Sequence, residues 1–216
     1  MDNISVNALH HRTNRIWNEE QIPDDWRKGL LVNLPKKGDL SLCNNWRGIT
    51  LLSIPSNFLY SVILQRIKTE VGKTLRDEQE GFRQERSCVD QIATLRIIVE
   101  QIIEWQTSLC MNFIGFEKAF DRIDHQVLWK ILKHYGIPQK IISIIQQLYD
   151  GFSCQVIHDE NLTEQFPVTT GVRKDCILSP LLFLMVIGWV SKTVYKEHSL
   201  RAYNGHYKPD WKILTS

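Results

Sequence analysis

Two kinds of apolar spacing occur along this chain, and their order restricts the fold more than any single residue does. Helical spacing is clearest at 56–74, where Leu59, Ile63 and Ile67 recur on one face. Extended spacing is clearest in the short apolar run 29–34, which a proline ends. Because the two kinds follow one another without the regular rhythm of a doubly wound sheet, the sequence predicts an α+β fold.

Apolar spacing and capping residues together predict six helices. They cover residues 13–21, 56–74, 87–105, 127–135, 138–151 and 179–190. Ser87, which has an acidic residue three places later, is expected to cap the third of these helices. Ser179, followed by Pro180, is expected to start the last one.

Three further segments have the character of strands. Residues 110–116 form an apolar run after the third helix, and 154–157 and 164–169 flank the turn-forming sequence HDENL. The last two segments predict an antiparallel hairpin. The sequence contains no internal repeat and no low-complexity linker.

The composition argues against some functional classes. With 43% hydrophobic and 23% charged residues, the chain has the balance of a soluble globular protein. Its longest apolar run, 176–190, is interrupted by Ser179-Pro180 and is shorter than the roughly 20 residues that cross a bilayer, so no membrane partner is expected. A net charge of +2 does not identify a nucleic-acid-binding protein, which has to be recognised from local clusters of Lys and Arg.

The cysteines indicate a reducing compartment. The five of them are far apart and include no CxxC pair. We interpret them as reduced thiols of an intracellular protein, in the nucleus or the cytoplasm. No positively charged segment leads into an apolar stretch at the N-terminus, so a secretory signal is not expected.

Four segments, in order, resemble the reverse transcriptase domain of LINE-type non-LTR retrotransposons. They read LPKKGDLSLCNNWRGITLLS at 34–53, LRDEQEGFRQERSCVDQIATLR at 75–96, FIGFEKAFDRIDHQVLW at 113–129 and VTTGVRKDCILSPLLFLMVI at 168–187. The resemblance implies a partial right-hand polymerase fold without a thumb. It divides the chain into a helical lead-in at 1–27, fingers and adjoining palm helices at 28–108, and an incomplete palm at 109–216.

The first segment is similar to the fingers loop that holds the incoming nucleotide. The resemblance implies that Lys36, Lys37 and Arg47 meet its triphosphate, a role that cations on an extended loop suit well. The alternative is a solvated basic turn. This alternative stays more open for the two lysines than for Arg47.

The second segment implies a contact with the template–primer duplex. Arg83 and Arg86 lie just before a predicted helix, where side chains and the first amide groups together can approach a phosphate backbone. The alternative is that these charges only cap and solvate the helix.

The third segment departs from the family pattern at its metal-binding position. The usual FxDFEKAFD places an aspartate at position 115, and this chain has Gly115, which has no oxygen to coordinate Mg2+. Phe120 matches the bulky gate that excludes a ribose 2'-hydroxyl. Glu117 lies on the same strand face in extended geometry but about 6.6 Å along the strand, too far to replace the missing ligand. Asp121 and Asp124 are interpreted as turn or capping residues.

The fourth segment carries a second departure. Its family form, GVRQGCxLSP, is GVRKDCILSP here, so that Lys174 replaces glutamine and Asp175 replaces glycine beside Arg173. The resemblance places Arg173 and Lys174 against the template–primer duplex. A side chain and a negative charge at Asp175 are expected to obstruct the close approach that glycine permits.

A third departure is an absence. The adjacent acidic pair, commonly FADD, that supplies the family's remaining catalytic aspartates does not occur between Ile187 and Ser216, where Asp210 is the one aspartate. The resemblance therefore predicts a truncated, degenerate reverse transcriptase domain that is catalytically inactive. No metal or other cofactor is expected for this chain, although the intact family uses Mg2+.

Two alternatives to this function remain. One is a residual nucleic-acid-binding module that uses Arg47, Arg83, Arg86 and Arg173 to bind RNA or DNA weakly. The other is a translated remnant with no cellular role. No protein partner is indicated. An active enzyme completed in trans would still lack an oxygen ligand at Gly115.

Overall fold

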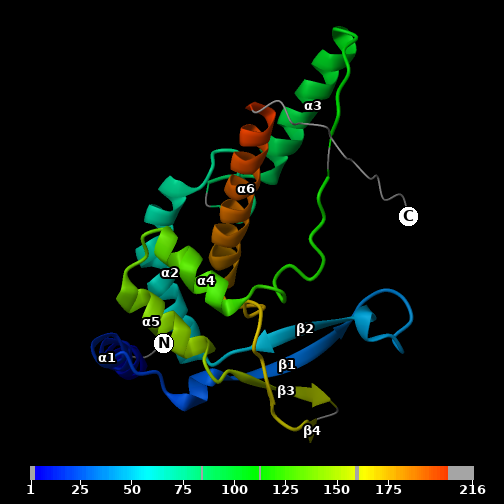
Figure 1. Cartoon of the computed structure of the whole chain (residues 1–216). Helices are drawn as coiled ribbons and strands as arrows, with labels where there is room; N and C mark the ends of the chain where they lie inside the picture. The colour runs from blue at the N-terminus through cyan, green and yellow to red at the C-terminus, as the bar shows by residue number, and fades with distance from the viewer. Residues whose placement is uncertain (1–2, 84, 112, 159–160, 204–216) are drawn as a thin grey trace.

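A mixed sheet forms the lower part of the molecule (Figure 1). The computed structural model describes residues 3–83, 85–111, 113–158 and 161–203, with side chains up to residue 193. Strand β1 (Lys28–Pro35) pairs antiparallel with β2 (Trp46–Leu51) and parallel with β3 (Ser153–His158). The short strands β4 (Asn161–Leu162) and β5 (Phe166–Pro167) both pair antiparallel with β3.

Six α-helices accompany the sheet in the described residues, as the sequence predicts. They are α1 (Asn3–Glu19), α2 (Ile54–Thr74), α3 (Cys88–Glu104), α4 (His125–His134), α5 (Gln139–Tyr149) and α6 (Ser179–Tyr203), with short 3-10 helices at Asp24–Arg27 and Cys43–Asn45. Helix α1 begins ten residues before its predicted start, because only Thr13 and Ile16 of it are buried and its exposed first turns show no apolar period. Helix α6 likewise extends beyond the predicted end.

Several helix starts follow from single side chains. Ser53 accepts a hydrogen bond from the amide of Ser56 at the start of α2, and Ser87 accepts one from Val89 at the start of α3, as predicted. The Asp124 carboxylate accepts one from the amide of Val127 (2.8 Å) and so caps α4. The predicted capping role of Asp124 is therefore confirmed.

The hydrophobic core lies between four helices rather than on the sheet. Helices α2, α4, α5 and α6 supply most of the side chains that are almost entirely buried. The largest are Leu59, Tyr60, Ile63, Leu128, Leu132, Ile144, Ile145, Leu148, Leu182, Leu184 and Met185. None of the described helices is both long enough and apolar enough to cross a membrane.

The prediction of a strand at 110–116 is wrong for the residues of this segment that the structure describes. These residues, like 107–109 before them, are irregular, and Phe113 and Ile114 are 82% and 78% exposed. An extended apolar segment becomes a strand when a neighbouring strand pairs its backbone and covers one face. The described strands of the sheet pair only among themselves, so this segment has no such neighbour.

The hairpin predicted around HDENL is confirmed in its direction but not in its length. Both β4 and β5 run antiparallel to β3, as expected. The second arm is only two short pieces rather than one strand over 164–169. With a mixed sheet and a separate helical core, the predicted α+β class agrees with the structure at the level of mixed helices and sheet.

Candidate active site

The loop at 168–175 is docked on the turn that precedes α4 through its backbone. The amide of Gly171 donates to the Ile123 carbonyl and that of Val172 to the Phe120 carbonyl, both at 2.8 Å. The Gly171 carbonyl accepts a hydrogen bond from His125 Nε2, also at 2.8 Å. These contacts join the third and fourth motif segments, which are about 50 residues apart in the sequence.

Gly171 is required for this close approach. Its φ is +84°, in the region that favours glycine, and a Cβ there would lie 2.8 Å from both the Phe120 carbonyl oxygen and the Asp121 Cα. Backbone atoms on the other side cannot move away as a flexible side chain would. A side chain at position 171 would therefore separate the two motif segments.

A cleft of about 550 Å³ opens beside this junction and brings all four motif segments together, the second of them through Phe82. Lys36 and Arg47 line it from the ends of β1 and β2, Phe120 from the turn, and Lys174 and Asp175 from the loop. These residues come from regions far apart in the sequence. The cleft is therefore the candidate active site.

The cations on the β1–β2 side of the cleft are free to meet an anion. Arg47 is exposed on β2 opposite Leu34 and makes no hydrogen bond or ion pair within the described residues. Lys36 is exposed as well, and its Nζ donates to the Asn44 carbonyl (3.1 Å). Lys37 is exposed but does not line the cleft. Triphosphate binding by these three residues stays a prediction.

Phe120 is held in a fixed aromatic stack. Its ring stacks on Phe183 of α6, with centroids 4.4 Å apart, and meets the edge of Phe82 at 6.3 Å. The ring is partly buried and lines the cleft between the cations and the loop. This is a suitable position for a sugar gate, although that role is untested.

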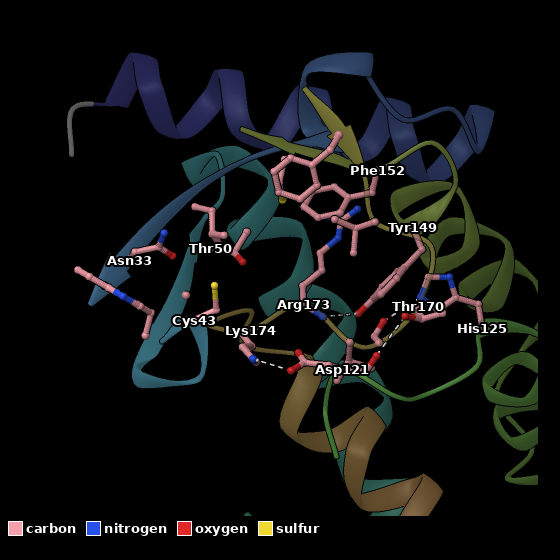
Figure 2. Close-up of a pocket in the computed structure, with 18 residues that line it drawn as sticks. Asn33, Cys43, Thr50, Asp121, His125, Tyr149, Phe152, Thr170, Arg173 and Lys174 are labelled. Carbon is pink, nitrogen blue, oxygen red and sulfur yellow. Dashed lines mark hydrogen bonds and ion pairs between the residues drawn. The ribbon is translucent and has the colours of Figure 1, made fainter. Parts of the chain in front are cut away.

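The residues of the third segment do not fit a Mg2+ ion. A Cβ at Gly115 would have no atom within 4 Å, and its neighbours Phe113 and Phe116 are exposed. Asp121 is paired with Lys174 at 2.8 Å (Figure 2), and Asp124 caps α4. Nowhere in the described residues do three His, Cys, Asp or Glu side chains come together as they would to hold a metal.

Asp175 keeps a backbone conformation that glycine would adopt. Its φ is +66°, which is uncommon for a residue with a side chain, although aspartate tolerates it better than most. This backbone conformation is compatible with the glycine that the family pattern has at this position. Obstruction of a nucleic acid strand by this carboxylate stays a prediction.

The two arginines predicted to contact template are engaged with the protein. Arg83 donates to the carbonyls of Arg76 (2.8 Å) and Gly72 (3.1 Å), which belong to the C-terminal end of α2 and the turn after it. Arg86 forms ion pairs with Glu80 (3.4 Å) and Asp77 (3.8 Å). These contacts favour the structural alternative for this segment, and a contact with nucleic acid remains a prediction.

Arg173 has surroundings that the sequence does not reveal. Predicted to contact the template–primer duplex, it is only 4% exposed, and its guanidinium carbon lies 3.7 Å from the centroid of the Phe152 ring. Its Nη1 donates to the hydroxyl of Tyr60, 113 residues away in the sequence. Because these partners are distant along the chain, no local pattern could have shown the burial, and contact with a duplex stays a prediction.

Comparison with known proteins gives one family match and several relatives. The family model "Reverse transcriptase (RNA-dependent DNA polymerase)" matches residues 34–210. The Transposon TX1 uncharacterized 149 kDa protein of Xenopus laevis is 29% identical over 83% of this chain and 14% of that protein. The Retrovirus-related Pol polyprotein from type-2 retrotransposable element R2DM of Drosophila melanogaster is 24% identical, over 82% of this chain and 16% of that protein.

A third relative has a polymerase in its name. The Probable RNA-directed DNA polymerase from transposon BS of Drosophila melanogaster is 27% identical over 79% of this chain and 19% of that protein. The chain thus spans less than a fifth of the length of these three relatives. The matches confirm the resemblance to LINE-type non-LTR reverse transcriptases that the four motif segments indicate.

Proposed function

Because this chain belongs to the reverse transcriptase (RNA-dependent DNA polymerase) family, we propose that it is a part of a non-LTR retrotransposon polymerase that has lost catalysis. In right-hand polymerase terms, residues 28–108 are fingers with adjoining palm helices, and 109–216 are an incomplete palm. Residues 1–27 form the helical lead-in. The joining of Lys36, Arg47 and Phe120 at one cleft supports this assignment.

The loss of catalysis rests on Gly115. The position at which the family holds a metal-binding aspartate has no side chain and lies in an irregular, exposed segment. Asp121, six residues later, is neutralised by Lys174. Metal ions supply several kcal/mol of transition-state stabilisation in reactions of this kind, and each ~1.4 kcal/mol lost is tenfold in rate. We therefore expect at most a trace of polymerase activity.

Primer extension tests this proposal. The full chain is incubated with a primed RNA template, deoxynucleotides and Mg2+, next to an active reverse transcriptase as a positive control. We expect no extended primer, even by a single nucleotide. Extension by the purified chain would show that other side chains hold the ions and would refute the loss of catalysis.

The cleft retains cations that suit the phosphates of a nucleotide. Nucleotide binding is therefore measured separately from catalysis. Arg47 is exposed, unpaired within the described residues and beside Phe120, so a labelled deoxynucleoside triphosphate is expected to bind weakly. Arg47→Ala should weaken that binding about tenfold, since a charge-assisted contact is lost. Lys130→Ala is the control, because Lys130 is an exposed cation of α4 that lies outside the cleft.

Residual nucleic-acid binding is the second candidate function, and exposed cations at the connection between β1 and β2 favour it. Lys37 and Arg47 are cations without a protein partner in the described residues. Phosphate contacts release counterions, so the affinity for single-stranded RNA should fall steeply as the salt concentration rises. Binding that does not change with salt would exclude phosphate contacts.

A further inference from the structure

A second cavity, of about 490 Å³, lies between the sheet and the loop at 168–174 (Figure 2). Aromatic side chains from three parts of the chain line it: Trp46 of β2, Tyr149 of α5 and Phe166 of β5. Phe152, just before β3, completes this wall. Cavities that bind small molecules are of this size, roughly 300–1,000 Å³, and have mostly apolar walls with a few polar groups.

The buried cation of this cavity is the guanidinium of Arg173. In Figure 2 its side chain extends between Phe152 and Tyr149, and its carbon lies 3.7 Å and 4.9 Å from the centroids of their rings. Nη1 donates to the Tyr60 hydroxyl, whereas Nε and Nη2 are buried and have no acceptor among the described residues. Nε and Nη2 form the side edge of the guanidinium, where two parallel N–H groups match the two oxygens of a carboxylate.

No described group around Arg173 supplies the missing negative charge. Burial raises the pKa of Tyr149 to about 12 and that of Tyr60 well above its usual value, so both phenols are neutral at pH 7. Burial likewise raises the pKa of the thiols of Cys154 and Cys176. The carboxylate that lines the cavity, Asp121, is paired with Lys174.

We propose that this cavity is a binding site for a small monocarboxylate with an apolar body. The carboxylate oxygens would accept from Nε and Nη2 of Arg173 once a shift of the aromatic wall uncovers these two atoms, which have almost no accessible surface in this structure. The apolar body would lie against the aromatic wall. A buried cation without a counter-charge is unfavourable, and a bound anion restores its partner. A free phosphate fits less well, because its additional oxygens would need further donors, and two donors of the cavity wall are already committed: Thr170 donates to the Asp121 carbonyl and Lys174 to the Asp121 carboxylate.

Benzoate and its neutral analogue benzamide test the charge requirement. The two have nearly the same shape, so the apolar wall would receive either one. Calorimetric titration of the full chain is expected to show benzoate binding and at least tenfold weaker binding of benzamide. Benzoate should also raise the melting temperature, because it binds only the folded state.

Two arginine variants test the assignment to Arg173. Arg173→Met replaces the guanidinium by an unbranched apolar side chain that reaches about as far as Nε, and it should reduce benzoate affinity at least tenfold. Arg66→Met is the matched control, since Arg66 also stacks on an aromatic ring, that of Trp17 at 3.9 Å, but does not line the cavity. Its affinity for benzoate should equal that of the unmodified chain.

Three results would overturn the proposal. They are equal binding of benzoate and benzamide, unchanged benzoate binding by Arg173→Met, and binding of inorganic phosphate in preference to benzoate. The comparison of the two ligands uses only the unmodified chain, so it decides the matter even if Arg173→Met does not fold. The proposal is independent of polymerase activity, although Arg173 and Lys174 line both this cavity and the neighbouring cleft.

Discussion

The helical core and helix α3 have similar sequences and opposite environments. In the core, α5 alone contributes six buried residues, among them Ile145 and Leu148, which are fully buried. Helix α3 has more branched apolar residues than α5 but none that is buried, and Ile92 and Ile103 are 67% and 70% exposed. In Figure 1, α3 lies at the opposite end of the molecule from the sheet, and the irregular residues 107–111 and 113–116 follow it.

This difference shows what an apolar pattern does and does not mean. The pattern identifies the face of a helix that is stabilised by burial, because removal of apolar surface from water is favourable. It does not say which element provides the cover. Within the described residues no side chain of α3 is buried, and Phe113 and Ile114 further along the chain are exposed as well. Exposed apolar surface, where it is contiguous, is where association or aggregation begins.

The largest effect on stability is expected when the same Ile→Ala substitution is made in the helical core and in helix α3. Ile145→Ala, at a fully buried position of α5, should lower the free energy of unfolding by about 2–5 kcal/mol, since it leaves a cavity. Ile92→Ala, at a position of α3 that is 67% exposed, should change it by less than about 0.5 kcal/mol. Urea denaturation measures both. A cost at Ile92 as large as that at Ile145 would show that α3 is covered in solution.

The next largest effect is expected when alanine replaces a glycine that packs against backbone, in comparison with a glycine that has no close neighbours. Gly171→Ala should cost about 2–3 kcal/mol, because a Cβ at φ +84° meets the backbone of the turn at 2.8 Å. Gly115→Ala should cost nothing, since its Cβ would have no neighbour within 4 Å. The measurement is again the denaturation midpoint. If the two variants are equally unstable, Gly115 is packed against a partner in solution.

A smaller effect is expected when the N-terminal cap of α4 is removed, in comparison with the cap of α3. Asp124→Ala removes the acceptor for the Val127 amide and should lower global stability by about 1 kcal/mol. Ser87→Ala removes the equivalent cap of α3, which carries no buried side chain, so it should loosen that helix without lowering global stability. Amide hydrogen exchange distinguishes the outcomes: faster exchange confined to α3 supports the difference, and equal global losses contradict it.

The smallest expected effect is a gain in stability rather than a loss. Asp175→Gly should stabilise the chain by about 0.5–1 kcal/mol, because glycine adopts φ +66° without strain. Glu85→Gly is a suitable comparison in the segment before α3, since Glu85 also has a positive φ, +60°. Thermal melting measures both. A loss of stability in Asp175→Gly would mean that the aspartate side chain supports the loop, contrary to its interpretation as a departure from the family form.

Much of the fold could be predicted, and the misses have a common cause. Helices α2 and α4 were found because their apolar period and caps are local features. The strand at 110–116 failed because a strand depends on a neighbour that local sequence does not specify. At the site, the motif segments predicted Lys36, Arg47 and Phe120, which the cleft brings together. The burial of Arg173 could not be predicted, since its aromatic partners are remote in the sequence.

The sequence by itself determined the family, the helices and the loss of an oxygen ligand at Gly115, because motifs, caps and side-chain chemistry are properties of short segments. Only the tertiary structure decided which charges are available. It pairs Asp121 with Lys174, engages Arg83 with carbonyl groups and buries Arg173 beside Phe152, while Arg47 stays exposed. The physical reason is that the availability of a charge depends on its solvent contact and its neighbours in space, and both are set by the packing of distant segments.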